Sequence, residues 1–130
     1  MTTIPASHAD LLDAPFATLG TVDRHGRPQL SQVCFLAEDG IVRLSLNTSR
    51  AKTGNLRRNP AVNVLITDPG NPMRSLELSG DAEIVPDVDG FVARAGAKYG
   101  MDFTEHDRPG EGRVVVTVRP HRVYATDLSG

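Results

Sequence analysis

Hydrophobic and polar residues alternate through the first half of the chain and predict a series of short β-strands. The predicted strands cover residues 16–22, 29–36, 41–46 and 61–67. Side chains alternate between the two faces of a strand, so each segment can bury one face in a core. The Asp, Gly and Pro residues at positions 23–28 are typical of a hairpin turn between the first two strands. This half of the chain therefore predicts an antiparallel sheet.

The second half continues the sheet but is interrupted more often. Three further strands are predicted at residues 73–85, 113–119 and 121–126. Gly80 lies inside the longest of them, where a glycine favours a bulge or a bend. Residues 68–72 hold two prolines and a glycine, and such a segment cannot continue a ladder of hydrogen bonds. Residues 100–112 are rich in Gly, Asp and Pro and predict a loop.

Short helices are predicted between these strands. Residues 7–13 have the pattern of a capped helix that ends before Pro15, and the hydrophobic residues of 87–99 recur at helical spacing. Another helix is predicted within residues 47–60, after a polar cap. About seven strands with two or three short helices indicate a mainly β chain of the α+β class, folded as a closed or nearly closed antiparallel barrel.

The composition is that of an ordinary globular domain. The 130 residues, 39% hydrophobic and 23% charged, suit a single domain spanning residues 1–130. No hydrophobic run reaches membrane-spanning length, and the amino terminus lacks the features of a secretory signal, so we expect a cytoplasmic protein without a membrane partner. Cys34 is the only cysteine and lies in an apolar strand, which favours a buried packing residue over a nucleophile.

Positive charge is concentrated in one window of the chain. Residues 41–67 contain five cations and no acidic residue, although the whole chain has a net charge of −2. The five cations are Arg43, Arg50, Lys52, Arg57 and Arg58. The remainder of the chain therefore carries about −7. Because a nucleic-acid groove would need a far broader basic surface, this asymmetry suits a small anionic ligand instead.

The centre of this window predicts an anion clamp at the start of a helix. Asn47, Thr48 and Ser49 form a polar cap, and Arg50 and Lys52 follow in the first helical turn. Cations there oppose the helix dipole, whose amino end is already partly positive. A phosphate resting on free backbone amides and the two basic side chains would remove that conflict. The alternative is that these cations decorate a solvated helix face.

No obvious set of catalytic side chains stands out in the sequence. The four histidines are scattered and have no His or Cys partner at ligand spacing, so no metal site is expected. A Gly-x-Ser-x-Gly elbow, a G-x-G-x-x-G loop and a Walker pattern are also absent. Such a chain is expected to bind and orient a cofactor that carries the chemistry.

Three motifs in fixed order resemble the pyridoxamine 5′-phosphate oxidase-like family. They are GRPQLSQV at residues 26–33, LNTSRAKTGNLRRNP at 46–60 and DPGNPMRSLELSG at 68–80. The likeness extends from about residue 16 to the carboxyl terminus and is in particular to the small branch that uses the deazaflavin coenzyme F420. It implies an antiparallel split β-barrel of the FMN-binding type, a homodimer with two cofactor sites at the subunit interface, and an oxidoreductase.

The resemblance also implies which residues bind the cofactor. Lys52 falls on the lysine of the family's Ser-Arg-Lys phosphate segment, while Arg50 and Ala51 occupy its serine and arginine positions. Ser31 stands where flavin-binding relatives carry an arginine, and this difference favours F420 over FMN. The expected cofactor-binding residues are Ser31, Gln32, Val33, Asn47, Thr48, Ser49, Arg50, Lys52, Asn55 and Arg74.

Two of these assignments have structural alternatives. Asn55 is either a hydrogen-bond partner of the phosphate or a polar residue of the helix surface. Arg74 either reaches the cofactor or a partner subunit, or forms a structural ion pair with Glu77 or Asp81. In the first alternative of each pair the residue belongs to the cofactor site, and in the second it lies outside that site.

The expected activity is hydride transfer between F420 and a small electron-poor organic substrate, as in an F420H2-dependent reductase. Arg57 and Arg58 either meet the glutamate carboxylates of the F420 tail or form a solvated helix end. Two rival functions remain open: an FMN-binding oxidoreductase of the same fold, and a non-catalytic carrier of F420 or flavin. No nucleic-acid partner is expected. Lys98 and Tyr99 are expected to be rim and packing residues.

Overall fold

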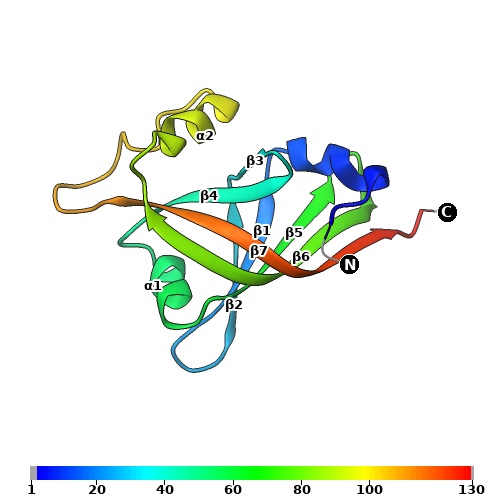
Figure 1. Cartoon of the computed structure of the whole chain (residues 1–130), viewed down its shortest axis with the longest axis horizontal. Coiled ribbons are helices and arrows are strands. Elements are labelled where there is room, and N and C mark those ends of the chain that lie inside the picture. The colour runs from blue at the N-terminus through cyan, green and yellow to red at the C-terminus, as the bar shows by residue number, and fades with distance from the viewer. Residues whose placement is uncertain (1–2, 130) are drawn as a thin grey trace.

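A curled β-sheet with short helices at its ends makes up the computed structural model, which describes residues 3–129 (Figure 1). The strands are β1 (Ala17–Val22), β2 (Pro28–Val33), β3 (Leu36–Glu38), β4 (Ile41–Asn47), β5 (Ala61–Asp68), β6 (Asn71–Pro86) and β7 (Arg113–Asp127). The helices are the 3-10 helix η1 (Ala6–Asp13) and the α-helices α1 (Ala51–Arg58) and α2 (Phe91–Tyr99).

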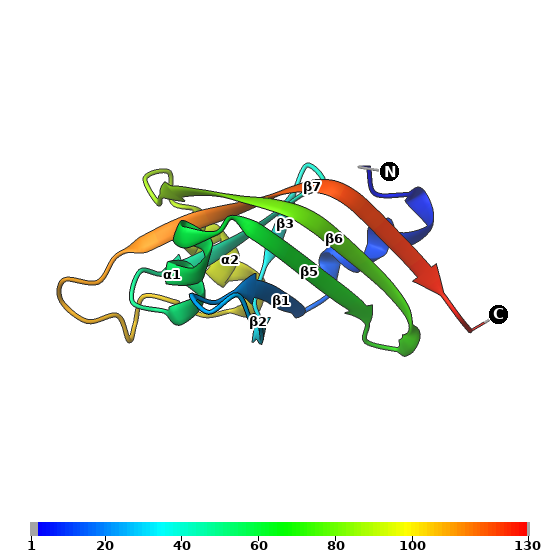
Figure 2. The ribbon, with the colours of Figure 1, turned by 90° about the horizontal axis from the view of Figure 1, so that it is seen from below.

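The seven strands form one antiparallel sheet in the order β2-β1-β5-β6-β7-β4-β3. The edge strands β2 and β3 are consecutive in the chain, and only two residues separate Val33 from Leu36. A chain of this length spans at most about 11 Å, so the two edges of the sheet lie close together and the sheet curls. Figure 2 shows the long strands β5, β6 and β7 sweeping side by side across the molecule. The predicted mainly β split barrel is therefore confirmed.

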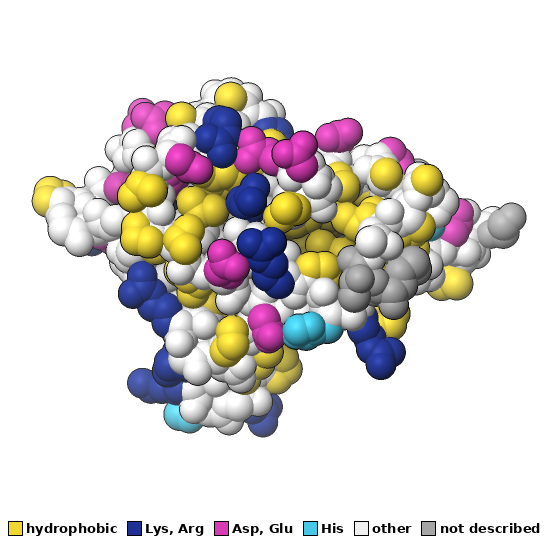
Figure 3. Space-filling model, in the orientation of Figure 1, with side chains coloured by type: hydrophobic (Ala, Val, Ile, Leu, Met, Phe, Trp, Pro, Cys, Tyr) yellow, Lys and Arg dark blue, Asp and Glu magenta, His cyan; other side chains and the backbone are white. Residues whose placement is uncertain are grey.

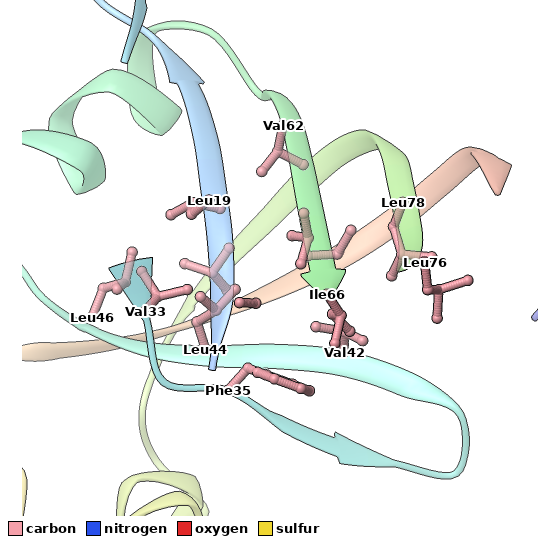
Figure 4. Packing of buried hydrophobic residues seen from close by; sticks show 14 of the residues in the cluster. Leu19, Val33, Phe35, Val42, Leu44, Leu46, Val62, Ile66, Leu76 and Leu78 are labelled. Atoms are coloured by element: carbon pink, nitrogen blue, oxygen red, sulfur yellow. The ribbon is translucent and has the colours of Figure 1, made fainter. Parts of the chain in front are cut away.

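The inside of the curled sheet holds the hydrophobic core. In β5 the buried residues Val62, Val64 and Ile66 alternate with exposed neighbours, as the two-residue period of a strand requires. Figure 4 shows side chains of the core converging from several strands: Leu19, Val33, Phe35, Val42, Leu44, Leu46, Val62, Ile66, Leu76 and Leu78. This packing holds β2 and β4 in place, and both strands lead into the site described below.

The end of the sheet differs from the prediction in one respect. Residues 113–127 form the single strand β7, so the prediction of two closing strands is wrong. The register of β6 against β7 shifts between Ser79 and Gly80, which leaves His121 as an extra residue on β7. A Cβ atom at position 80 would lie 2.0 Å from the carbonyl oxygen of Arg119, so only glycine fits there. The predicted bulge at Gly80 is confirmed.

The second strand is shorter than its pattern predicts. β2 ends at Val33, the chain turns at Cys34 and Phe35, and Leu36 begins β3. Phe35 is only 1% exposed, and its backbone amide donates a hydrogen bond to the hydroxyl of Tyr99 at 2.9 Å. The segment after β2 is therefore held by a helix distant in sequence, and the strand pattern of the segment does not reveal this contact.

The turn between β5 and β6 is tighter than predicted. β6 begins at Asn71, inside the segment 68–72 that its prolines predict to interrupt the sheet. Asn71 pairs with Asp68, and the register shifts between Thr67 and Asp68. The interruption is therefore confined to two residues, Pro69 and Gly70.

The helices begin later or wind more tightly than the sequence pattern suggests. The predicted amino-terminal helix is the 3-10 helix η1. α2 starts at Phe91, because the carboxylate of Asp87 accepts hydrogen bonds from the amides of Phe91 at 3.1 Å and Val92 at 2.8 Å and so caps the helix. Among residues 3–129, no helix combines the length and the hydrophobicity that a membrane span requires.

Candidate anion-binding site

A cavity of about 660 Å³ lies where β2, β4 and α1 meet the loop that joins α2 to β7. The sheet and α1 side contributes Gln32, Val33, Cys34, Ser45, Leu46, Asn47, Ser49, Arg50 and Lys52. The loop side contributes Met101, Asp102, Phe103, His106, Asp107, Arg108, Glu111 and Arg113. In Figure 3, Lys and Arg side chains gather over α1 and the β1–β2 hairpin, the end of the molecule that also carries the basic wall of the cavity.

The side chain of Asn47 builds the turn that leads from β4 into α1. Its Oδ1 accepts hydrogen bonds from the amide and the hydroxyl of Ser49, each at 2.7 Å. Its backbone oxygen accepts a hydrogen bond from Thr53 Oγ1 at 2.8 Å. Arg50 occupies the N-cap position without a side-chain cap. Within the described chain, the amides that follow it, those of Ala51 and Lys52, have no hydrogen-bond partner and remain available to an acceptor.

Lys52 is a half-buried cation at the edge of this turn. Its Nζ donates a hydrogen bond to Ser31 Oγ at 3.3 Å, which links α1 to β2. Burial, and to a lesser degree the nearby charge of Arg50, lower the pKa of Lys52. Among residues 3–129, no ion pair involves Lys52 or Arg50. Both positive charges therefore face the cavity without an ion-pair partner among these residues.

The opposite wall of the cavity is fastened to the same turn. The amide of Thr48 donates to the carbonyl oxygen of Gly112 at 2.9 Å, and the amide of Gly112 donates to Thr48 Oγ1 at 3.0 Å. Asn47 Nδ2 donates to Asp107 Oδ1 at 2.8 Å and to Glu111 Oε1 at 3.3 Å. These bonds join two segments that lie about sixty residues apart in sequence. The loop and the turn into α1 thus form one hydrogen-bonded unit.

Arg113 fixes the shape of the loop from within. Its guanidinium binds both carboxylate oxygens of Asp107, at 2.9 Å and 2.8 Å, and also the carbonyl oxygen of Phe103. This pair, and to a lesser degree the hydrogen bond from Asn47, lower the pKa of Asp107. A bidentate Arg–carboxylate pair is geometrically specific, so the loop has a defined position at the cavity.

Asn55 lies on the face of α1 that packs against β1 and β2, and it does not line the cavity. It is 3% exposed, and its Nδ2 donates to Thr21 Oγ1 at 3.1 Å and to Gln29 Oε1 at 2.6 Å. Its Oδ1 accepts a hydrogen bond from Arg58 at 2.8 Å. The described contacts therefore use both ends of the amide to pack α1 on β1 and β2. This arrangement differs from both sequence-based alternatives, a phosphate ligand and a residue of the helix surface.

Arg74 also lies outside the cavity. Its guanidinium binds Asp10 at 2.6 Å and Asp68 at 3.0 Å, and it donates to the backbone oxygen of Ser7. The expected structural alternative, an ion pair with Glu77 or Asp81, is wrong, since Arg74 instead joins η1 to the β5–β6 turn. β-sheet register could not predict Asp10 as a partner, because η1 is far from Arg74 in sequence, whereas Asp68 ends the neighbouring strand β5.

Six of the ten residues expected to bind a cofactor line the cavity: Gln32, Val33, Asn47, Ser49, Arg50 and Lys52. Ser31 does not line the cavity but accepts a hydrogen bond from Lys52, which does. Thr48 does not line it either, and its hydroxyl accepts a hydrogen bond from Gly112 of the loop. Asn55 and Arg74 are not brought together with the others. Cys34, predicted to be a buried packing residue, is half-buried and lies on the cavity wall.

The loop wall and Ser45 are the parts of the site that the sequence does not identify. Residues 101–113 have no hydrophobic period, so nothing local places them at the cavity. Ser45 Oγ is a buried hydroxyl with no hydrogen-bond partner among the described residues, and Ser45 lines the same cavity. A buried, unpartnered hydroxyl is unusual in a folded protein and fits a site that receives a polar ligand.

Comparisons with known proteins identify the family of the chain and support its fold. The sequence profile of the pyridoxamine 5′-phosphate oxidase family matches residues 4–127. A solved F420 reductase is 34% identical, with a TM-score of 0.80, and the alignment covers 93% of this chain and 98% of that one. No curated protein matches the sequence.

Two further solved structures resemble the chain over most of its length. A conserved hypothetical protein from Mycobacterium tuberculosis is 26% identical, with a TM-score of 0.77 and coverage of 96% of this chain and 85% of that one. HupZ from Group A Streptococcus is 20% identical, with a TM-score of 0.71 and coverage of 95% and 94%. The likeness to HupZ concerns the fold alone.

Proposed function

Because this chain belongs to the pyridoxamine 5′-phosphate oxidase family of split-barrel oxidoreductases, we propose that it is an F420H2-dependent reductase. The family binds cofactors of the flavin and F420 type. The 34% identical F420 reductase, aligned over nearly the whole chain, supports F420 for this member. The proposed substrate is a small, electron-poor organic molecule, and FMN is the alternative cofactor.

The observation that carries this proposal is the uncompensated positive charge at one end of the cavity. Lys52 is half-buried, and neither it nor Arg50 has a carboxylate partner among the described residues. Burying a cation without a partner is unfavourable, so such a group favours binding of an anion. A phosphate is the anion that both the start of a helix and two basic side chains suit best.

In this proposal the cofactor phosphate lies against the start of α1. Lys52 and Arg50 supply charge, while the free amides of Ala51 and Lys52 supply hydrogen-bond donors. The Ser49 hydroxyl, which donates to Asn47 Oδ1 in this structure, would exchange that acceptor for the phosphate. Asn47 and Thr48 act on the phosphate indirectly, because their side chains hold the turn and the loop in position. The clamp then needs no rearrangement of the sheet.

The end of β2 is proposed to form the wall along which the ring system lies. Gln32 and Val33 line the cavity, and Ser31 ties this strand to Lys52. When bound, the deazaflavin ring supplies the hydride. The residues of this chain bind the ring in one orientation and leave the remaining volume of the cavity for the substrate. Apolar side chains such as Leu46, Met101 and Phe103 suit an uncharged organic acceptor there.

We also propose a homodimer in which the second copy completes the cofactor site. Phe16, Leu30 and Leu65 expose 48%, 70% and 38% of their surface on neighbouring strands or just before them. Exposed apolar side chains in one region favour burial against a second molecule. Sedimentation velocity checks this: we expect a species of twice the 14.0 kDa chain mass.

Titration of the purified protein with F420 and, separately, with FMN tests the cofactor. We expect a dissociation constant in the micromolar range or tighter for F420, and binding of FMN weaker by about tenfold or more. A preference for FMN would assign the flavin instead, and binding of neither would refute the proposal. Binding of F420 without oxidation of F420H2 by a panel of quinones and enones would identify a carrier.

A further inference from the structure

The carboxylate of Glu111 lies beside the proposed clamp. Its Oε1 accepts a hydrogen bond from the Arg108 amide at 2.7 Å and from Asn47 Nδ2 at 3.3 Å. The hydrogen bond from the Arg108 amide is the largest cause that lowers the pKa of Glu111, so this side chain is ionised at neutral pH. Glu111, Ser49 and Lys52 line the same cavity.

The charge of Glu111 is not neutralised as that of its neighbour is. Asp107 forms the bidentate pair with Arg113. In the part of the chain that the structure describes, Glu111 takes part in no ion pair. Glu111 therefore places a negative charge without an ion-pair partner on the wall of the cavity that also holds Arg50 and Lys52.

Two anions in one cavity repel each other in proportion to their charges. A phosphodiester such as that of F420 carries one negative charge. A phosphate monoester such as that of FMN carries about −1.5 to −2 at pH 7. A fixed carboxylate at the clamp consequently disfavours the monoester more strongly than the diester, although both present the same acceptor oxygens.

We propose, on the basis of the proposed function, that Glu111 is a specificity-determining residue that selects phosphodiesters against phosphate monoesters at this clamp. The cations Lys52 and Arg50 attract both kinds of ligand, and Glu111 subtracts from that attraction according to the charge of the phosphate group held at the clamp. The residue thereby biases the chain toward F420 and away from FMN without contacting either ring. A carboxylate that merely shapes the loop would show no such dependence on ligand charge.

The substitution Glu111→Gln tests this inference, because it removes the charge and keeps an oxygen that accepts the Arg108 hydrogen bond. We expect FMN to bind about three- to tenfold more tightly to the variant than to the wild type, and F420 to gain clearly less. Glu105→Gln is the matched control. Glu105 lies in the same loop, is exposed and does not line the cavity, so its substitution should leave the ratio of the two affinities unchanged.

Inorganic phosphate and dimethyl phosphate separate this inference from the cofactor assignment. Measured by calorimetry or by chemical-shift titration, Glu111→Gln should strengthen binding of phosphate more than binding of the diester, whichever cofactor the protein uses. If neither F420 nor FMN binds but this shift is seen, the proposed function fails and the inference stands. The inference is overturned if Glu111→Gln leaves the ratio of phosphate to dimethyl phosphate affinity unchanged, or if Glu105→Gln shifts that ratio equally. It is also overturned if phosphate binds neither to the wild type nor to Glu111→Gln.

Discussion

The two lysines of this chain have contrasting surroundings. Burial lowers the pKa of both Lys52 and Lys98. Lys98 donates to the carbonyl oxygens of Ala14 at 2.7 Å and Phe35 at 2.9 Å, and its Nζ lies 3.8 Å from the centroid of the Phe35 ring. Lys52 has one hydrogen-bond acceptor among the described residues, Ser31 Oγ at 3.3 Å.

The difference between the two sites separates a structural cation from the one that we propose binds the cofactor phosphate. The ammonium of Lys98 is satisfied by the fold, and it fastens α2 to the segment after η1 and to the turn between β2 and β3. The ammonium of Lys52 has lost part of its hydration without equivalent compensation. A folded protein that keeps such a group can recover the lost interaction by binding an anion.

The largest expected effect breaks the structural site. Lys98→Met should lower the free energy of unfolding by about 2–4 kcal/mol, because the Ala14 and Phe35 carbonyl groups lose the Lys98 donor and the contact with the Phe35 ring is lost. The matched variant Lys52→Met should change it by less than about 1 kcal/mol. Chemical denaturation of both variants checks the contrast, and equal losses would contradict it.

The next effect breaks the binding site. Lys52→Ala should weaken F420 binding by roughly 1.5–3 kcal/mol, about ten- to 150-fold, if Lys52 makes one charge-assisted hydrogen bond to the phosphate. Arg122→Ala is the control, since Arg122 is exposed on β7 and its removal changes the net charge equally. An unchanged dissociation constant for Lys52→Ala would remove Lys52 from the clamp.

A smaller effect sharpens the structural site. The Tyr99 hydroxyl accepts a hydrogen bond from the Phe35 amide at 2.9 Å and donates to the carbonyl oxygen of Pro15 at 2.6 Å. Tyr99→Phe should therefore lower the free energy of unfolding by about 1–2 kcal/mol. Thermal or chemical denaturation measures the loss. F420 affinity should remain that of the wild type, and a large change in affinity would place Tyr99 in the binding site instead.

The smallest effect near neutral pH concerns the titration of Lys52. Because its pKa is lowered from 10.5, Lys52 releases its proton at a lower pH than an ordinary lysine. F420 affinity should therefore fall as the pH rises through this lowered pKa, and the fall should begin below pH 10.5. Lys52→Arg should shift this fall to higher pH, since arginine stays charged. Titrations of the wild type and of Lys52→Arg with F420 across alkaline pH measure this difference.

Several elements could be predicted because their signals are local. The alternation in β5, the bulge opposite Gly80 and the polar turn before α1 could each be predicted from residues close together in the chain. Other predictions failed where a distant partner decides the outcome. Phe35, just past the end of β2, is held by Tyr99 of α2, and Arg74 binds Asp10 of η1 and Asp68 of β5 but neither Glu77 nor Asp81.

Asn55 illustrates the same limit inside the candidate site. The family resemblance implied a phosphate ligand at this position, but the fold turns its amide toward Thr21 and Gln29. Helix periodicity locates a residue on a helix, whereas the direction that face takes depends on which strands pack against it. Six of the expected residues nevertheless share one cavity.

The sequence by itself determined the sheet-forming segments, the bulge at Gly80 and the concentration of cations at the start of α1, since each depends on residues close together in the chain. Only the tertiary structure decided that residues 101–113 form the far wall of the cavity and that Glu111 stands beside the clamp. It also decided which lysine the fold satisfies and which it leaves for a ligand. The physical reason is that the hydrophobic period and the local concentration of charge depend on residues close together in the chain. Burial and hydrogen-bond satisfaction depend on segments about sixty to eighty residues apart.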